Sequence, residues 1–524
     1  MLYTVGGIKI GFEGDQNSLL EKELKKRGFS VHQIQSFRIL KRSLDCRKKD
    51  DIHYLYQVEV ITDSLLKNPA PGIKEVHKAP TPTLYPKNLE GPIVVVGAGP
   101  AGLFAALRLA ELGFKPLILE RGRPVEDRVK DVNQFWDRSL LLPDSNMQFG
   151  EGGAGTFSDG KLNTRIDNPL MNTVFQELVL AGAPPEILYD YKPHVGTDLL
   201  VGIVAQLRQK ILRLGGVFRF SARVVDWKES QGEIKGLVLA DGEVIPAAQV
   251  ILATGHSARD VYSLLARRGV ALEPKPFAVG TRIEHPQELI NQMQYGTHAK
   301  DPRLPTATYS FTHNFESKGS RKGVFTFCMC PGGEVVSSAS EVGGTLVNGM
   351  SNSTRDGPFA NSAVVVSVGP EDYGPGLLEG MLFQSRLEQD QFQAAGGYGA
   401  TFQRLQDFMA QKPSVGSVES SFRMELVPGS LHKTLPPLVV QGLRAGFEGW
   451  SRVRSFINPA AVLIGHETRT SSPLRILRGE SGASLSHPNL FPAGEGAGYA
   501  GGIVSAAVDG LRVVESGFCL PQEG

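Results

Sequence analysis

The chain has 524 residues, of which 41% are hydrophobic and 21% charged, and its formal net charge is +1. This is the composition of a soluble globular protein long enough for two to four domains, and the near-zero charge argues against a dedicated binder of nucleic acid or another polyanion. No apolar run reaches the roughly 18 residues of a membrane-spanning helix, and the start lacks a secretory signal. Four cysteines without a CxxC pair suit a reducing compartment. We therefore expect a cytoplasmic protein with a small-molecule substrate and no membrane span; its oligomeric state stays open.

Residues 1–66 predict a small N-terminal α/β domain. Residues 2–12 and 52–60 have strand patterns, and 17–26 predict a charged helix. The basic run at 41–49 can be a solvated loop, a site for an anionic partner, or a contact with the next domain. Prolines recur across 67–90, which predicts an extended linker.

The most informative motif follows this linker. An apolar run predicts a buried parallel strand, and it leads into a turn where Gly97, Gly99 and Gly102 stand at GxGxxG spacing. These glycines allow a tight turn, the approach of a pyrophosphate, and close packing of helix on strand. The pyrophosphate would lie at the helix N-terminus, where N–H groups and the dipole favour an anion. Glu120 ends the next apolar run, 23 residues after Gly97, and can accept hydrogen bonds from ribose hydroxyls. This order predicts a bound adenine dinucleotide.

The following region predicts a long loop and a small meander. The glycine-rich stretch at 146–162 has no strand before it, so we expect a functional loop rather than a second dinucleotide turn. The elements predicted around it are helices at 124–140 and 197–214 and meander strands at 217–227, 234–239 and 243–246.

Two later segments converge on the same site. Residues 250–255 predict a second buried strand that ends in Ala-Thr-Gly. Near the C-terminus, a short strand runs into a glycine turn that contains Glu495, and a helix of small residues begins near Ala500. A helix N-terminus preceded by an acid suits a ring system that becomes anionic on reduction. Glu495 can also hold a sugar-alcohol hydroxyl.

This order of segments resembles the FAD-dependent oxidoreductases of the glutathione-reductase fold, in the branch with one dinucleotide domain. More narrowly, the chain resembles a poorly characterised family of FAD-dependent dehydrogenases or FAD-binding proteins. This resemblance extends over nearly the whole chain and is carried by the strings FGEGGAGTFSDGKL, VGTRIEHP, GMSNSTRDG and HETRTSSPLRI. The resemblance implies FAD as the cofactor. It also implies an α/β fold with an α+β insert, in which a Rossmann-like FAD/NAD(P)-binding domain of three-layer ββα architecture carries an inserted, mostly β substrate domain. The expected domains are 1–66, the linker 67–90, the FAD-binding domain at 91–261 and 466–524, and the insert at 262–465.

The resemblance also implies FAD contacts, position by position. They are Gly97, Gly99, Pro100, Ala101, Gly102, Glu120, Arg121, Gly153, Lys161, Val224, Thr254, Gly255, Gly494, Glu495, Gly501, Gly502 and Ile503. The disulfide reductases of this fold have Asp where Glu495 stands, and the single-nucleotide branch often accepts Glu.

Four side chains in or beside the insert are candidates for catalysis. Arg282 can clamp an anion, or pair with a neighbouring carboxylate, and His285 can act as an acid or base. Arg469 can lie near the flavin, hold a substrate carboxylate, or form a local ion pair. Lys161 can stabilise the reduced flavin anion, contact a phosphate, or stay solvated. Nothing in the pattern predicts a metal site.

Cys328 and Cys330 stand two apart on a predicted strand, so both can face the flavin. A thiol there could accept electrons. Cysteines at this spacing close a strained ring poorly, and a buried cysteine is commonly a small hydrophobic residue.

The favoured hypothesis is an FAD-dependent, dehydrogenase-like oxidoreductase that transfers hydride between flavin and a small organic substrate. Its electron donor, if it acts as a reductase, would be NAD(P)H bound transiently, because no second nucleotide domain is predicted. The alternatives are a catalytically silent flavoprotein that binds tRNA or protein, and an FAD monooxygenase. Salt-dependent binding to polyanions would favour the first alternative, and a hydroxylated product the second.

Overall fold

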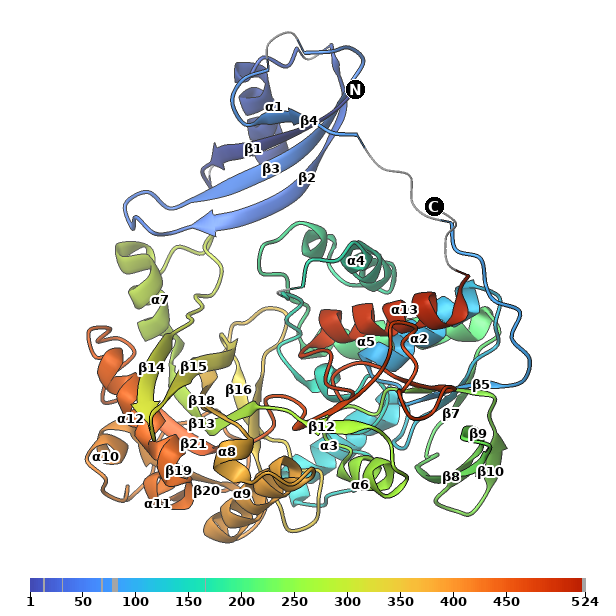
Figure 1. Cartoon of the computed structure of the whole chain (residues 1–524). Coiled ribbons are helices and arrows are strands. Elements are labelled where there is room, and N and C mark those ends of the chain that lie inside the picture. The colour runs from blue at the N-terminus through green and yellow to red at the C-terminus, as the bar shows by residue number, and fades with distance from the viewer. Residues whose placement is uncertain (13–14, 31, 67–68, 78–82, 165, 521–524) are drawn as a thin grey trace.

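The computed structural model describes residues 1–12, 15–30, 32–66, 69–77, 83–164 and 166–520. A small N-terminal unit sits above two larger parts, one built on a parallel sheet and the other on a mostly antiparallel sheet (Figure 1). Within the described residues, no helix has the length and apolar character needed to cross a membrane.

The N-terminal unit is a four-stranded sheet in the order β2–β3–β1–β4. Its strands are β1 (Leu2–Ile10), β2 (Ile34–Asp45), β3 (His53–Thr62) and β4 (Ile73–Glu75), and α1 (Gln16–Lys26) packs on one face through Leu20 and Leu24. Two expectations are corrected here. Strand β2 continues through the first half of the basic run, and β4 forms inside the predicted linker. Residues 67–68 and 78–82 of that linker lie outside the described residues.

The β2–β3 hairpin joins the unit to both larger parts (Figure 1). Arg42 pairs with Asp190 at 2.6 Å, and its backbone N–H donates to the Tyr189 carbonyl at 2.7 Å. Lys49 Nζ donates to the Met293 carbonyl at 2.8 Å, on α7 (Gln287–Tyr295). Of the three interpretations of the basic run, the structure therefore supports a contact with the neighbouring parts of the chain.

The first large part has three layers, as predicted. Its parallel sheet has the order β23–β11–β5–β6–β7, formed by β5 (Ile93–Val96), β6 (Leu117–Leu119), β7 (Val217–Arg219), β11 (Gln249–Leu252) and β23 (Leu490–Pro492). Ile93 and Val95 face a layer of helices, whereas Val94 and Val96 face an antiparallel meander. The helices are α2 (Pro100–Glu111), α4 (Leu170–Leu180), α5 (Thr197–Arg213) and α13 (Ile503–Phe518), and the meander is β8 (Val224–Ser230), β9 (Glu233–Leu239) and β10 (Val244–Pro246). This confirms the ββα fold class.

The strand predicted at 217–227 is two strands in the structure. β7 joins the parallel sheet and β8 begins the meander. Between them Ser221 has φ 54°, and its N–H donates to the Gly122 carbonyl at 2.9 Å. The left-handed backbone at Ser221 redirects the chain from one layer to the other, which a continuous apolar pattern does not reveal.

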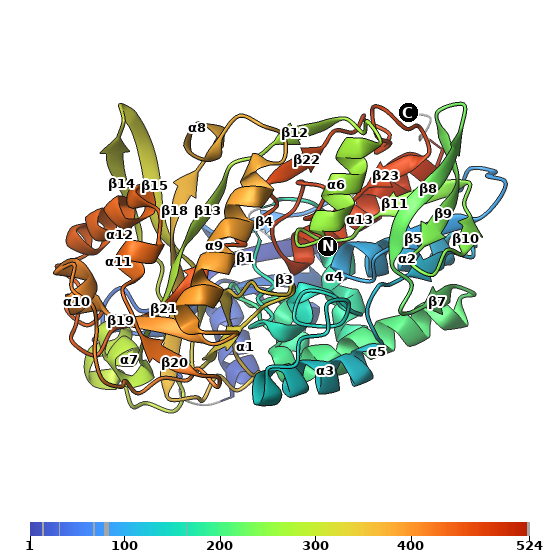
Figure 2. The ribbon, with the colours of Figure 1, turned by 90° about the horizontal axis from the view of Figure 1, so that it is seen from below.

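The second large part is built on a seven-stranded sheet in the order β14–β15–β18–β13–β21–β19–β20. Its strands are β13 (Phe277–Pro286), β14 (Thr312–Ser317), β15 (Ser320–Cys330), β18 (Phe359–Val368), β19 (Ala400–Arg404), β20 (Leu426–Pro428) and β21 (Val462–Glu467). Helix α12 (Pro437–Gly449) covers one face, and α9 (Glu379–Ala395) lies toward the junction with α6 (Arg259–Arg267) (Figure 2). Strands β12 (Leu272–Pro274) and β22 (Leu474–Ile476) pair where the chain passes between the two parts.

Shorter elements complete the fold. They are β16 (Glu334–Ser337), β17 (Val347–Met350), α3 (Val125–Arg138), α8 (Pro370–Tyr373), α10 (Leu405–Met409), α11 (Leu431–Thr434) and the 3-10 helices η1 (Ala154–Phe157), η2 (Pro185–Leu188) and η3 (Gly296–His298).

Candidate functional site

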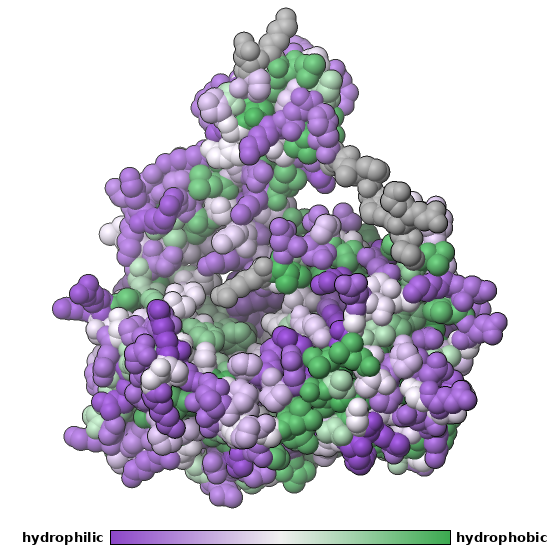
Figure 3. Space-filling view, viewed as in Figure 1, coloured by the Kyte–Doolittle hydropathy of each residue, from purple (hydrophilic) through white to green (hydrophobic). Residues whose placement is uncertain are grey.

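A cavity of about 470 Å³ lies between the two large parts. The surface is hollowed below the N-terminal unit (Figure 3). All of the implied FAD contacts line the cavity except Gly102 and Gly494. On the opposite side its wall comes from the seven-stranded sheet and its neighbours, through Thr326, Phe327, Cys328 and Asn348.

The glycine turn after β5 has the shape that its sequence predicts. Gly97 has φ 101°, and a Cβ there would overlap the Ala253 carbonyl. A Cβ on Gly99 would meet only the Gly153 Cα, at 3.7 Å, on the protein side. A Cβ on Gly102 would overlap the Gly97 carbonyl, which explains why Gly102 packs helix on turn and does not line the cavity.

Two helix N-termini open onto the cavity. Helix α2 begins after Gly99 and α13 after Gly502, and neither of these glycines has a side chain to cap the helix. The free N–H groups of each first turn and the positive end of each dipole favour an anionic ligand. A Cβ on Gly255 or Gly501 would meet nothing within 4 Å, so the walls at these glycines leave room for a group to approach the backbone. The arrangement fits an elongated dinucleotide with a central pyrophosphate.

Glu120 lies at the end of β6 and is held by backbone donors. Its carboxylate accepts from the N–H of Ala98 at 2.7 Å, Gly122 at 2.9 Å and Gly150 at 3.1 Å. A carboxylate has about four acceptor positions, so one remains for a ribose hydroxyl. The neighbouring Arg121 pairs with Asp260 on α6.

His256 is a cavity residue that the sequence prediction missed. Its Nδ1 lies 3.9 Å from Glu495 Oε1, and its buried Nε2 has no hydrogen-bond partner among the described residues. Burial, together with the nearby guanidiniums of Arg469 and Arg259, lowers the His256 pKa to about 3, so the ring is neutral. Burial raises the pKa of Glu495 to about 7, although Lys275 opposes this. An unpartnered buried nitrogen in a cavity wall fits a site that is completed by a ligand. In the sequence, the feature that could have indicated His256 is its position directly after the Ala-Thr-Gly turn.

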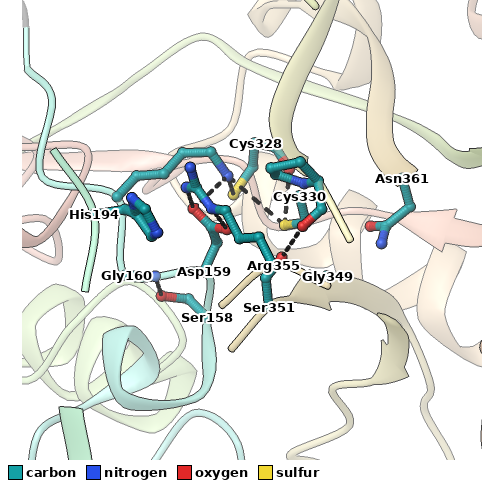
Figure 4. A network of polar contacts seen from close by, with 12 residues as sticks. Ser158, Asp159, Gly160, His194, Cys328, Cys330, Gly349, Ser351, Arg355 and Asn361 are labelled. Atoms are coloured by element: carbon teal, nitrogen blue, oxygen red, sulfur yellow. Dashed lines mark hydrogen bonds and ion pairs between the residues drawn. The ribbon is translucent and has the colours of Figure 1, made fainter. Parts of the chain in front are cut away.

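Lys161 reaches the cavity from the long loop and meets two thiols of the opposite part. Its Nζ lies 3.3 Å from Asp159 Oδ2, 4.0 Å from Cys328 Sγ and 3.7 Å from Cys330 Sγ. Asp159 also pairs with Arg355 (Figure 4). Burial alone would lower the Lys161 pKa, but Asp159 and the two thiols outweigh burial and raise it, so the amine is charged.

Two of the predicted catalytic residues lie outside the cavity lining. Arg282 is fully buried, pairs with Glu467 at 3.0 Å and donates to Asn361 at 2.7 Å. This agrees with the alternative in which Arg282 pairs with a neighbouring carboxylate. His285 is also fully buried, and its Nε2 lies 2.7 Å from the Phe456 carbonyl within an aromatic cluster. Because neither faces the cavity, the structure supports no anion clamp at Arg282 and no acid–base role at His285.

Arg469 lines the cavity, and each of its three guanidinium nitrogens donates one hydrogen bond within the protein. It pairs with Glu388 at 2.6 Å and donates to Ser340 Oγ at 2.7 Å. Glu388 is shared with Arg259, at 2.7 Å. The local ion-pair interpretation describes Arg469, and this network joins α6 to α9 behind the cavity wall.

The fold and the cavity define a dinucleotide-binding protein of the Rossmann-like class. Residues 95–125 match the family described as an NAD(P)-binding Rossmann-like domain, and 276–470 match the family described as FAD-dependent protein, C-terminal domain-like. Residues 7–61 match a domain of unknown function. An uncharacterized protein of Clostridium beijerinckii is 43% identical over 526 residues, which is 98% of each chain. The chain belongs to the same family as that protein, a family of FAD-dependent flavoproteins, and its cofactor is FAD.

More distant similarities are confined to parts of the chain or are weak. Thiamine thiazole synthase of Thermotoga maritima is 27% identical over 195 residues, covering 35% of this chain and 64% of that protein. Glycine oxidase from Geobacillus kaustophilus matches 81% of this chain and 92% of its own, at 13% identity and a TM-score of 0.33. The flavin-dependent brominase Bmp2 matches 81% and 77%, at 10% identity and a TM-score of 0.36. These values carry no inference about the reaction.

Proposed function

We propose that this flavoprotein is a dehydrogenase-like oxidoreductase that transfers hydride between FAD and a small organic substrate. The observation that supports this proposal is that both large parts contribute to the cavity wall. The glycine turns of the parallel sheet form one side, and the other side is formed by Thr326, Phe327, Cys328 and Asn348. A cofactor held on the first side would therefore face a second wall against which a substrate could bind.

The residues that would hold FAD follow from the lining. The α2 N-terminus at Gly99–Ala101 would bind the pyrophosphate, and Glu120 a ribose hydroxyl through its remaining acceptor position. Glu495 would hold a hydroxyl of the sugar-alcohol chain, and the α13 N-terminus at Gly502 would favour negative charge on the ring. When bound, FAD supplies two-electron redox chemistry.

The chain's own residues then orient the substrate and control protons. Lys161 presents a positive charge beside the wall formed by β15, so it would attract an anionic substrate group or stabilise developing negative charge. Phe327 limits water on that wall, and neutral His256 offers Nε2 as a hydrogen-bond partner. The ion pair with Glu388 holds Arg469 in place, so Arg469 would contribute by keeping the cavity wall rigid.

The donor in a reductive reaction would be NAD(P)H bound transiently in the same cavity. The parallel sheet, within the described part of the chain, has one glycine turn of the β5–α2 kind, and FAD would occupy it. Donor and substrate would then enter in turn, which predicts ping-pong kinetics.

Anaerobic half-reactions test this proposal. Photoreduced enzyme is mixed with pools of small oxidised compounds, and oxidised enzyme with their reduced forms, while the flavin absorption is followed. The proposal predicts a compound that changes the flavin spectrum and yields one product molecule per flavin. A flavin that reacts only with oxygen, giving a hydroxylated product, would contradict hydride transfer and favour a monooxygenase.

A further inference from the structure

Two cysteines and a lysine meet at the wall of the cofactor cavity. Cys328 lines the cavity, whereas Cys330 lies behind it and is 0% exposed. The two cysteines lie close together (Figure 4). Lys161 Nζ lies 4.0 Å from Cys328 Sγ and 3.7 Å from Cys330 Sγ, so one ammonium bridges both sulfurs. Arg282 adds a second positive charge, with Nη1 4.0 Å from Cys330 Sγ.

The backbone is distorted where the two thiols meet. The pairing of β15 with β18 shifts register between Phe327 and Cys330, and Cys328 has φ 46°. A regular strand would separate residues two apart by roughly 6.6 Å, near the upper limit for a disulfide. A bulge bends the strand and re-aims a side chain, and left-handed backbone at a residue other than glycine is concentrated at functional sites. The distortion therefore weakens the argument that two cysteines at this spacing close a disulfide poorly.

The hydrogen bond between the two thiols shifts their pKa values in opposite directions. Hydrogen bonding from Cys330 lowers the pKa of Cys328 well below its usual range; burial opposes this, and Lys161 and Arg282 reinforce it. The same hydrogen bond, together with burial, raises the pKa of Cys330. The negative groups near the pair are Asp159, Glu467 and Glu495. Asp159 pairs with Arg355 and Lys161, and Glu467 pairs with Arg282, which limits their effect on the thiols. Cys328, which lines the cavity, is therefore placed to attack as the thiolate, and the buried Cys330 lies behind it as the thiol.

We propose that Cys328 and Cys330 form a dithiol centre that reduces a small disulfide bound in the cofactor cavity. This proposal rests on the proposed function: the small organic substrate is a disulfide, and the dithiol carries the electrons between FAD and that substrate. A thiolate is the nucleophile in thiol–disulfide exchange. A carbon electrophile would need only the exposed thiolate, whereas reduction of a disulfide needs a second thiol behind the first, and Cys330 is in that position.

The order of attack follows from exposure. The Cys328 thiolate attacks one sulfur of the substrate RSSR, so that a Cys328–S–S–R bond forms and RS⁻ leaves. Cys330 then loses its proton to the departed RS⁻ and attacks Cys328 Sγ, which releases the second RS⁻ and leaves a Cys328–Cys330 disulfide. The substrate gains two electrons and the dithiol loses them. FAD, when bound and reduced, would supply the two electrons and one proton that restore the Cys328 thiolate and the Cys330 thiol.

Exchange with glutathione disulfide tests this centre directly. The thiol-reduced, FAD-loaded protein is mixed with glutathione disulfide without oxygen, quenched with acid, and its peptides are analysed by mass spectrometry. We expect wild-type protein to give a Cys328–Cys330 disulfide, Cys330→Ser to retain glutathione on Cys328, and Cys328→Ser to give neither product. Lys161→Met should slow attachment in the Cys330→Ser background at least tenfold, because the thiolate loses its nearest cation. Cys46→Ser, which alters a cysteine outside the cavity, should leave all rates unchanged.

The proposal is overturned if Cys328 in Cys330→Ser reacts no faster than Cys46, or if wild-type protein accumulates a glutathione adduct instead of the internal disulfide. The visible flavin spectrum of the same samples distinguishes a failure of the dithiol proposal from a failure of the proposed oxidoreductase function. Bound, reducible flavin with an inert Cys328 contradicts the dithiol centre alone, whereas rapid exchange in protein that binds no flavin contradicts the proposed oxidoreductase function.

Discussion

Gly99→Val should weaken FAD binding strongly while leaving the fold intact. On the protein side, a Cβ at Gly99 would meet only the Gly153 Cα, at 3.7 Å, which is ordinary van der Waals contact. The larger side chain would instead extend into the cavity at the start of α2, where the pyrophosphate would approach the N–H groups of Ala101 and Gly102. Loss of two hydrogen bonds to a charged group costs about 1.5–3 kcal/mol each. The sum of about 3–6 kcal/mol corresponds to a roughly 100-fold to 10,000-fold rise in Kd.

The assay is FAD binding by the deflavinated protein, followed by fluorescence quenching, with a thermal melt to check folding. Gly202→Val is the matched control, because Gly202 is an exposed position on α5 where a Cβ would meet nothing within 4 Å. The control should bind FAD as wild-type protein does. A Gly99→Val protein whose Kd lies within threefold of wild type would refute the assignment of the pyrophosphate to the α2 N-terminus.

Four further predictions concern stability. Gly102→Ala should destabilise the protein by about 3 kcal/mol or more, since its Cβ would overlap the Gly97 carbonyl; a denaturation midpoint equal to wild type would contradict this packing role. Glu388→Gln should cost about 3–5 kcal/mol in urea denaturation because it leaves Arg259 and Arg469 buried without their shared carboxylate, and a loss below 1 kcal/mol would argue against the network. Burial lowers the pKa of His285 and of His466 to about 4. The free energy of unfolding therefore keeps its full value above pH 6.5, the unfolded pKa, and falls by up to about 3 kcal/mol per residue as the pH falls from 6.5 toward 4. His285→Phe should flatten this pH dependence, and an unchanged slope of the free energy against pH would contradict the prediction. A double-mutant cycle of Arg42→Ala and Asp190→Ala should give a coupling of about 1 kcal/mol, and a coupling of zero would show that this pair does not hold the N-terminal unit in place.

Local requirements made much of the fold predictable. The β5–turn–α2 unit is recognisable because each glycine meets a steric requirement set by residues of the turn or its neighbours. Strand β13, Phe277–Pro286, has a continuous strand pattern that ends at a proline. Strand β2, Ile34–Asp45, was not predicted, since charged residues on the outer face of a sheet look the same in sequence as those in a loop.

Contacts between distant segments were not predictable. Lys161 and the two thiols are more than 160 residues apart along the chain, and only the docking of the long loop against β15 brings them together. The same holds for Glu388, which meets Arg259 and Arg469 from a third segment. His285 shows a related limit: a strand pattern indicates which face a side chain occupies, but not whether that face meets a cavity or an aromatic core. The domain boundaries at 91, 262 and 466 stay predictions.

The measurement that tests the central claim most directly is the visible spectrum of the purified protein, taken before and after anaerobic addition of NADPH and, separately, of a chemical reductant. The account predicts a flavin band equivalent to one FAD per chain, which the chemical reductant bleaches completely and which NADPH bleaches if the enzyme acts as a reductase. A protein that is colourless as purified, and stays so after incubation with excess FAD, would contradict the account.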